Sequence, residues 1–195
     1  DAELVSPWLT DWRGRYTGKA CAMASPASTE ELAQLVKLCA AHGVPIVPQG
    51  GNSGMSGGAT PDETGNAILL SMRRMNAIRE IDVEARRVTC EAGVVLQTLH
   101  EAVEEKDLRF PLTLVLRHGS MRALVLGLEA VLPDGQVYSM LTPLKKDNRG
   151  FDLKQLLIGS EGTMGIVTAA TLQLVPALAD RVVIWAGLPS LGIAR

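Results

Sequence analysis

The feature that most limits how this chain can fold is the stretch at residues 48–59, which reads PQGGNSGMSGGA. Glycine loses more conformational freedom on folding than any other residue, so five glycines within twelve residues oppose a helix or a regular strand. The stretch therefore predicts a loop between an apolar run and a proline-bounded turn. Because such a loop is costly to order, it is the first candidate for a binding site.

Two common phosphate-binding motifs are excluded by the spacing of this loop. A Walker loop needs a lysine after its last glycine, and no lysine occurs between Lys37 and Lys106. A dinucleotide fingerprint must run into a helix, whereas ATPDETG follows here and forms turns. Backbone amides could still wrap a pyrophosphate, with Asn52, Ser53 and Ser56 as added donors. On composition alone, a flexible surface loop that binds nothing explains the glycines equally well.

A second cluster of small residues, GSEGTMGIVT at residues 159–168, repeats this design and has Glu161 as its only charge. Locally, Gly159 is typical of a helix C-cap followed by a tight turn. Two such clusters in 195 residues suggest one extended ligand held from two sides.

The rest of the chain predicts helices that interrupt runs of strands. Ser28 and Glu31 form a capping-box pattern that starts a helix, and His42-Gly43 is a plausible stop. A second helix is predicted from Leu96 to Leu108 and a short one within residues 151–159. Strands are predicted at 44–48, 67–72, twice within 78–94, twice within 123–140 and at 166–176. Because strands and helices do not alternate strictly, an α+β fold is favoured over a doubly wound sheet.

Charge and composition exclude several classes of partner. The net charge is −2, with 47% hydrophobic and 21% charged residues, and Lys and Arg do not cluster. Nucleic acid and anionic membranes are therefore not expected partners, and no run is long enough to span a membrane. Three widely spaced cysteines predict reduced thiols. Together with a start that lacks a signal-peptide pattern, they predict a cytoplasmic location.

Metal and glycosidase chemistry find little support. The three histidines, His42, His100 and His118, lack metal-ligand spacing, so no metal site is predicted. The acidic pairs Asp147/Asp152 and Glu104/Glu105 are better explained as solvated or ion-paired residues, because a sugar site needs more aromatics than the 4% present. Methionines such as Met72, Met75, Met121 and Met164 are interpreted as core or gap-filling residues.

Five segments together resemble a known family. In order they are WRGRYTGKA, SPASTEELAQLVKLCAAHGVPIVPQGGNSGMSGGATP, FPLTL, RHGSMRALVLGLEAVLPDGQV and LTPLKKDNRGFDLKQLLIGSEGTMGIVTAATLQLVP. They resemble the PCMH-type FAD-binding domain of FAD-linked 2-hydroxyacid dehydrogenases, which have the vanillyl-alcohol-oxidase fold. The likeness is strongest to the D-2-hydroxyglutarate and D-lactate dehydrogenase branch. It covers nearly the whole chain.

The resemblance implies an α+β fold of two FAD-binding subdomains, with mixed sheets flanked by helices. Residues 1–72 would form the first subdomain with the pyrophosphate loop, 73–180 the second, and 181–195 the start of a linker to a substrate domain. Relative to the family, a stretch rich in small residues that also grips FAD is missing between Leu114 and Val115. Whether that stretch is deleted or only unrecorded is left open, with the second favoured because both flanks keep the family pattern.

The family's cofactor-binding positions carry over to specific residues here. Those of the first loop would hold the FAD pyrophosphate, one pair would lie near the flavin ring, and those of the second loop would close over the cofactor. Asn52 stands where some members attach flavin through a histidine, so non-covalent FAD is expected. In that order the residues are Pro48, Gln49, Gly50, Gly51, Asn52, Ser53, Gly57 and Gly58; Pro111 and Leu112; and Gly159, Glu161, Gly162, Gly165 and Ile166.

The function implied is oxidation of a D-2-hydroxy acid to the 2-oxo acid by hydride transfer to flavin. A separate molecule would accept the electrons, and a homodimer is compatible with the family. The sequence ends before the family's substrate domain, which would supply the catalytic histidine, the arginine for the substrate carboxylate and any divalent metal. No catalytic residue is therefore assigned here. The alternative is a non-catalytic FAD-binding module or a cofactor-free fragment of this fold.

Overall fold

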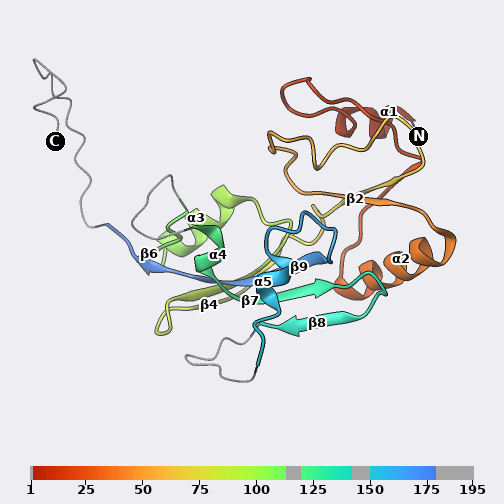
Figure 1. Ribbon diagram of the computed structural model, residues 1–195. Helices are drawn as coiled ribbons and strands as arrows, with labels where there is room; N and C mark the ends of the chain where they lie inside the picture. Colours follow the sequence, from red (N-terminus) through yellow and green to blue (C-terminus); the bar gives the residue numbers. More distant parts are fainter. Residues whose placement is uncertain (1, 113–119, 142–149, 179–195) are drawn as a thin grey trace, which may run out of the picture.

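A computed structural model describes residues 2–112, 120–141 and 150–178. It contains three sheets and several helices arranged in two parts, with the small sheet and α2 at one end and the large sheet and α3 at the other (Figure 1). The helices are α1 (Ala2–Val5), a 3-10 turn η1 (Ser6–Trp8), α2 (Thr29–His42), α3 (Leu96–Glu104), α4 (Met121–Leu124) and α5 (Lys154–Leu157). The strands are β1 (Ala22–Ala24), β2 (Ile46–Gln49), β3 (Ile68–Ser71), β4 (Ile78–Asp82), β5 (Arg87–Glu91), β6 (Leu108–Arg109), β7 (Val125–Val131), β8 (Val137–Met140), β9 (Ile166–Gln173) and β10 (Val175–Pro176).

The α+β prediction is confirmed. The first sheet is parallel with the order β1-β3-β2, and the second is antiparallel with the order β4-β5-β9-β7-β8. A short antiparallel pair, β10-β6, lies at the edge. The strands of the first sheet lie within the predicted subdomain 1–72 and those of the second within 73–180. The boundary between subdomains stays a prediction, and the predicted linker at 181–195 lies outside the described residues.

Helix α2 forms where the sequence predicts it, because both of its ends are capped. The Ser28 side chain accepts a hydrogen bond from the Glu31 amide (3.2 Å), and the Glu31 carboxylate accepts one from the Ala27 amide (2.8 Å). The reciprocal bond thus reaches one residue further back than in the usual capping box. Gly43 ends the helix in the left-handed conformation, with φ of +64°. The predicted second helix is shorter than expected and ends at Glu104.

Two hydrophobic clusters position the elements. In one, α2 packs through Leu32 and Val36 against Leu70 of β3 and against Val131 and Ile166 of the large sheet. In the other, α3 and the strand β6 cover the large sheet. Because α2 contacts both sheets, it fixes the geometry of the groove between them.

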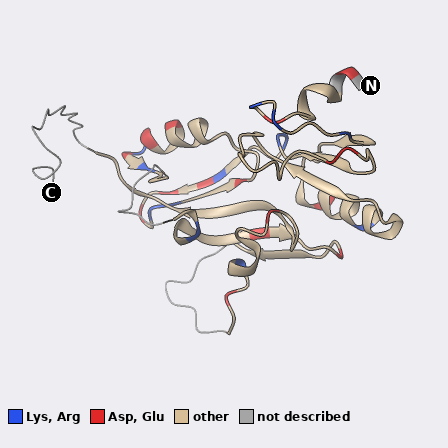
Figure 2. Ribbon diagram, turned by 45° about the horizontal axis from the view of Figure 1, so that its top comes forward, with Lys and Arg blue, Asp and Glu red and all other residues tan. Residues whose placement is uncertain are grey.

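A group of polar side chains, here named the Glu129 cluster, crosses four adjacent strands of the large sheet and reaches α2. Its five members are Thr29 of α2, Arg79 of β4, Glu91 of β5, Glu129 of β7 and Thr168 of β9. Both threonine hydroxyls donate to Glu129 Oε1 at 2.8 Å, and Arg79 Nη2 lies 3.1 Å from Oε1 of each glutamate. In the wider molecule, Lys and Arg are scattered among acidic residues along the ribbon (Figure 2).

Burial raises the pKa of Glu129, but the hydrogen bonds from Arg79, Thr29 and Thr168 outweigh burial and leave that pKa lowered overall. The carboxylate is therefore ionised in the folded protein at neutral pH. The cluster joins the start of α2 to the centre of the large sheet.

Candidate functional site

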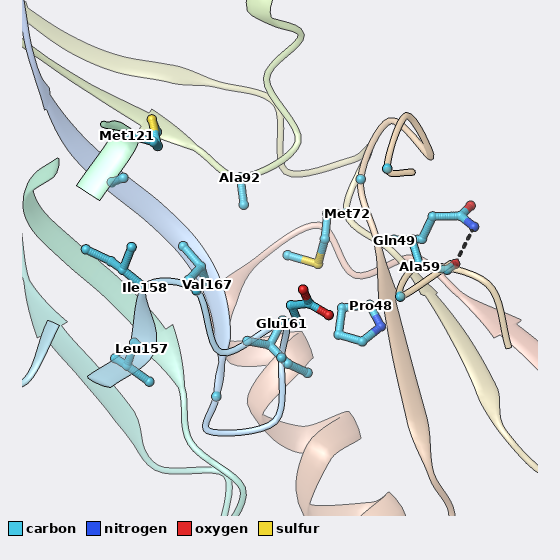
Figure 3. A pocket seen from close by; sticks show the side chains of 18 of the residues that line it. Pro48, Gln49, Ala59, Met72, Ala92, Met121, Leu157, Ile158, Glu161 and Val167 are labelled. Carbon is cyan, nitrogen blue, oxygen red and sulfur yellow. Dashed lines mark hydrogen bonds between the residues drawn. The ribbon is translucent and has the colours of Figure 1, made fainter. Parts of the chain in front are cut away.

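The two glycine-rich clusters of the sequence face each other across one cavity. Its volume is about 550 Å³, and one wall is the first loop while the other is the turn that leads into β9. Figure 3 shows Pro48, Met72 and Glu161 pointing into the same space, with Leu157, Ile158 and Val167 on the opposite side. The structure therefore brings together two segments that are more than a hundred residues apart.

Close contacts between the two walls explain two of the glycines. A Cβ on Gly162 would lie 2.7 Å from Pro48 Cγ, and φ of this residue is +83°. A Cβ on Gly58 would lie 2.9 Å from Glu161 Oε2. Real Cβ atoms do not approach that closely, so a side chain at Gly162 would push the two walls apart, whereas one at Gly58 would displace the flexible end of Glu161. The absence of side chains here preserves the cavity.

A second cavity, of about 600 Å³, lies against the same loop. It is lined by Gly50, Gly51 and Ser53 of the loop, by Arg73 and Asn76 after β3, and by residues 92–96 before and at the start of α3. Gly50 and Ala92 line both cavities, so the two cavities adjoin each other along the first loop. We name this combined site the glycine cradle.

The first loop presents unpaired backbone donors to the cradle. Within residues 2–112, 120–141 and 150–178, none of the amides from Gly50 to Gly58 donates a hydrogen bond to another protein group. Seven of these nine residues are exposed, and Asn52 and Gly57 are half-buried, so the free amides can be reached by an anion from solvent. Because the loop also lacks bulky side chains, an anion can approach the backbone closely. These features fit a diphosphate, as the sequence suggested.

Gln49 and Asn52 hold the loop in place through their side chains. The Gln49 Nε2 donates to the carbonyls of Trp8 (3.0 Å) and Ala59 (2.9 Å), so it ties the two ends of the loop together. Figure 3 shows its bond to Ala59. Asn52 has a positive φ of 52° and donates from Nδ2 to the Thr10 carbonyl at 2.9 Å. Both side chains that were predicted as cofactor-binding are thus engaged with the protein.

The predicted site residues divide into three groups by their positions. Nine line the first cavity, two more line only the second, and four line neither. In that order they are Pro48, Gln49, Gly50, Gly58, Gly159, Glu161, Gly162, Gly165 and Ile166; Gly51 and Ser53; and Asn52, Gly57, Pro111 and Leu112.

Two of these four have a clear structural setting elsewhere. Pro111 is buried beside Phe110, and Leu112 packs against the core of the large sheet. The Leu114–Val115 junction, where the family has an additional stretch, lies outside the described residues, as does His118. Proximity of Pro111 and Leu112 to a flavin ring stays a prediction.

Sequence reasoning did not identify several apolar residues of the first cavity as lining residues. Met72, Ala92, Met121 and Leu128 line the cradle, and the sequence offered no signal that separates them from core residues. Met121 and Met164 are 39% and 52% exposed, so neither is a core residue. A cavity wall and a core have the same composition, and only the structure separates them.

No metal site or membrane helix is present in the described residues. Within residues 2–112, 120–141 and 150–178, no group of three or more His, Cys, Asp or Glu side chains is placed to hold a metal ion. Over the same ranges, every helix is too short or too polar to cross a bilayer. Cys21, Cys39 and Cys90 are free thiols, and burial raises the pKa of Cys90 to about 11.

Comparison with known proteins gives consistent results. The family described as FAD binding domain matches residues 20–116. A mitochondrial D-2-hydroxyglutarate dehydrogenase from Bos taurus is 40% identical over an alignment of 194 residues, which covers 88% of this chain and 35% of that protein. A D-2-hydroxyglutarate–pyruvate transhydrogenase from Saccharomyces cerevisiae is 37% identical over 192 residues, covering 87% of this chain and 38% of that protein. The fold matches a solved alkyldihydroxyacetonephosphate synthase with a TM-score of 0.67 and 23% identity, covering 79% of this chain and 31% of that one.

The relatives overturn the predicted cytoplasmic location. The similar dehydrogenases from Bos taurus and Danio rerio are mitochondrial by name. The prediction rested on reduced cysteines and on the absence of a secretory pattern, and neither distinguishes one reducing compartment from another. The chain spans about a third of the length of these relatives.

The family match, the fold and the cradle lead to one assignment. The matched segment contains the first loop, β3 and most of the second cavity, and its family is defined by binding FAD. The free amides of the first loop fit the cofactor's diphosphate, and the two glycine contacts keep the walls of the first cavity close together. The chain therefore belongs to the PCMH-type FAD-binding domain family.

Proposed function

We propose that this chain is the cofactor-binding part of an FAD-dependent oxidoreductase that oxidises a D-2-hydroxy acid, of the D-2-hydroxyglutarate or D-lactate type, to the 2-oxo acid. The observation that carries the proposal is the glycine cradle, in which an amide-rich loop lines two adjoining cavities and an apolar wall faces it across the first one. The similarity to D-2-hydroxyglutarate dehydrogenases supports the choice of substrate class.

In this proposal the protein binds and orients while the cofactor does the redox chemistry. FAD, when bound, supplies the acceptor for the hydride of the hydroxy acid. The first loop donates its free amides to the diphosphate, and Gln49 keeps the loop in the conformation that presents them. The apolar side chains of Met72, Leu128 and Ile158 exclude water from the space beside the second loop. Glu161 offers hydrogen-bond acceptors there to polar groups of the cofactor.

The remaining parts of the reaction are assigned outside the described residues. A base for the hydroxyl proton and a cation for the substrate carboxylate are expected on a further part of a longer protein, since the relatives are about three times as long. A separate molecule would then take the electrons from reduced FAD. The 1–72 and 73–180 subdomains would bind FAD between them, with Pro111 and Leu112 near the flavin.

The proposal is tested with the full-length protein expressed with ample riboflavin. The purified protein should show flavin absorbance and should reduce an artificial dye when given D-2-hydroxyglutarate or D-lactate. Because Asn52 cannot form the histidyl link, acid precipitation should leave the flavin in the supernatant. A protein without flavin absorbance that takes up no added FAD would refute the proposal.

A second candidate is a non-catalytic FAD-binding module. It is favoured by one observation, namely that the described residues hold no cluster of ionisable side chains arranged for acid–base chemistry in the cradle. Dye reduction by the 195-residue chain and by the full-length protein separates the two candidates. Activity only at full length supports an oxidoreductase whose other residues lie elsewhere, and flavin binding without turnover in either form supports the module.

A further inference from the structure

The two halves of the cradle carry single charges of opposite sign. Among the described residues that line the first cavity, Glu161 is the only charged one, and among the described residues that line the second, Arg73 is the only charged one. Both cavities share the free amides around Gly50. An extended ligand with one anionic part is therefore favoured with that part in the second cavity, beside Arg73, and disfavoured with it in the first, beside Glu161.

Arg73 is held ready for a ligand by an aromatic ring. Its guanidinium carbon lies 3.9 Å from the centroid of the Trp8 ring, a cation–π contact. The Trp8 carbonyl in turn accepts the hydrogen bond from Gln49 at the base of the loop. Trp8 thus fixes the position of the cation relative to the loop amides.

Arg73 has no protein counter-ion in the part of the chain that the structure describes. Arg79 pairs with Glu91 and Glu129, Arg87 pairs with Asp82, and the neighbouring Arg74 donates to the Ser25 carbonyl at 2.8 Å. Arg73, by contrast, makes no hydrogen bond or ion pair to any described residue. All its N–H donors are left available on a side of the loop that no carboxylate lines.

We propose that Arg73, stacked on Trp8, binds the diphosphate of the cofactor and selects ligands that carry one. This inference rests on the proposed FAD binding; it names a residue that binds the cofactor and the direction in which the cofactor lies in the cradle. The diphosphate lies on the Arg73 side of the first loop, because charge-assisted hydrogen bonds add to those of the amides there. On the other side the Glu161 carboxylate repels the diphosphate, which leaves that half of the cradle to uncharged parts of the cofactor.

The test uses the full-length apoprotein, with FAD, ADP and riboflavin as probes. Arg73→Gln removes the charge, Arg73→Lys keeps it without the planar fork, and Arg74→Gln removes the adjacent arginine outside the cavity. Dissociation constants are measured by fluorescence titration at several salt concentrations. Circular dichroism and thermal melts establish that each variant is folded.

Arg73→Gln should weaken FAD and ADP about tenfold and leave riboflavin unchanged, since only the first two carry a diphosphate. Arg73→Lys should weaken FAD about threefold and Arg74→Gln should have no effect. The salt dependence of FAD binding should be shallower in Arg73→Gln than in the unsubstituted protein.

Equal FAD affinity of Arg73→Gln and Arg74→Gln would overturn the assignment, as would an equal loss for FAD and riboflavin, which would indicate a structural role. If the unsubstituted protein binds ADP through Arg73 but no flavin, the diphosphate site stands and the proposed function fails. If it binds none of the three probes, both fail.

Discussion

The Glu129 cluster and the glycine cradle both lie where the N-terminal part meets the large sheet, yet they are built in opposite ways. In the cluster, the carboxylate oxygens of Glu129 and Glu91 receive hydrogen bonds from hydroxyl, guanidinium or amide groups. In the cradle, the loop amides have no partner among the described residues. The two are adjacent in the chain, because Glu91 belongs to the cluster and Ala92 lines both cavities. Because the Glu129 cluster holds the N-terminal part against the large sheet, the glycine cradle can leave its polar groups free for a ligand.

The strongest test of this comparison is Arg79→Met. It leaves two largely buried carboxylates without their cation, and we expect a loss of about 2–4 kcal/mol in the free energy of unfolding, measured with urea. FAD affinity of the folded protein should change less than threefold. The control is Arg87→Met, which removes the single ion pair with Asp82 between β4 and β5 and should lower the free energy of unfolding by about 0.5 kcal/mol. An equal loss of unfolding free energy in the two variants would show that the Glu129 cluster does not stabilise the contact between α2 and the large sheet.

Gly162→Ala acts on the cradle and should affect both stability and binding. The new methyl group would collide with Pro48, and the left-handed backbone disfavours any side chain. We expect about 1–2 kcal/mol of destabilisation and at least a tenfold weaker dissociation constant for FAD. Gly14→Ala has a similar φ of +66° but no atom within 4 Å of its Cβ, so it measures the backbone strain alone. A Gly162 variant that binds FAD as well as the Gly14 variant would contradict the contact between the walls.

Gly50→Ala should separate binding from stability altogether. A Cβ at Gly50 meets no protein atom within 4 Å, and the residue lines both cavities. The unfolding free energy should stay the same or rise slightly, since alanine reduces the freedom of the unfolded chain. FAD affinity should fall about tenfold, because the methyl group occupies space next to the loop amides. Unchanged affinity would place the cofactor away from this loop.

Local signals account for most of what the sequence predicts correctly. Helix α2 has its capping residues in the sequence, and the turn at Gly135, which takes a positive φ, is marked by Pro133 and Asp134 before it. The short strands β1, β6 and β10 have two or three residues each, and their pairing depends on partners far along the chain. No local pattern predicted β1 or β6, and β10 was predicted only as the end of one continuous strand at 166–176.

The glycine cradle and the Glu129 cluster differ in how far the sequence could predict them. Glycine spacing exposed both walls of the cradle, because a loop that must approach a ligand closely shows this in its composition. The Glu129 cluster left no such mark, since Arg79 and Glu129 are fifty residues apart and resemble ordinary solvent-facing strand residues. The difference between Arg73 and Arg74 is likewise invisible in sequence, because it depends on which neighbour each one meets.

The smallest expected effect tests the charge state of the cluster. Thr168→Val removes one hydrogen bond to Glu129 and should cost about 1 kcal/mol at pH 7. The folded pKa of Glu129 is lowered, so its contribution is complete above the ordinary carboxyl value of about 4.3 and is lost as the pH falls through the folded value. The difference in unfolding free energy between Thr168→Val and the unsubstituted protein should therefore become smaller below about pH 4. Thr171→Val is the control, because its hydroxyl donates to the Leu141 carbonyl, which does not titrate. If the difference in unfolding free energy for Thr168→Val does not change with pH, the Thr168 hydrogen bond does not depend on an ionised Glu129.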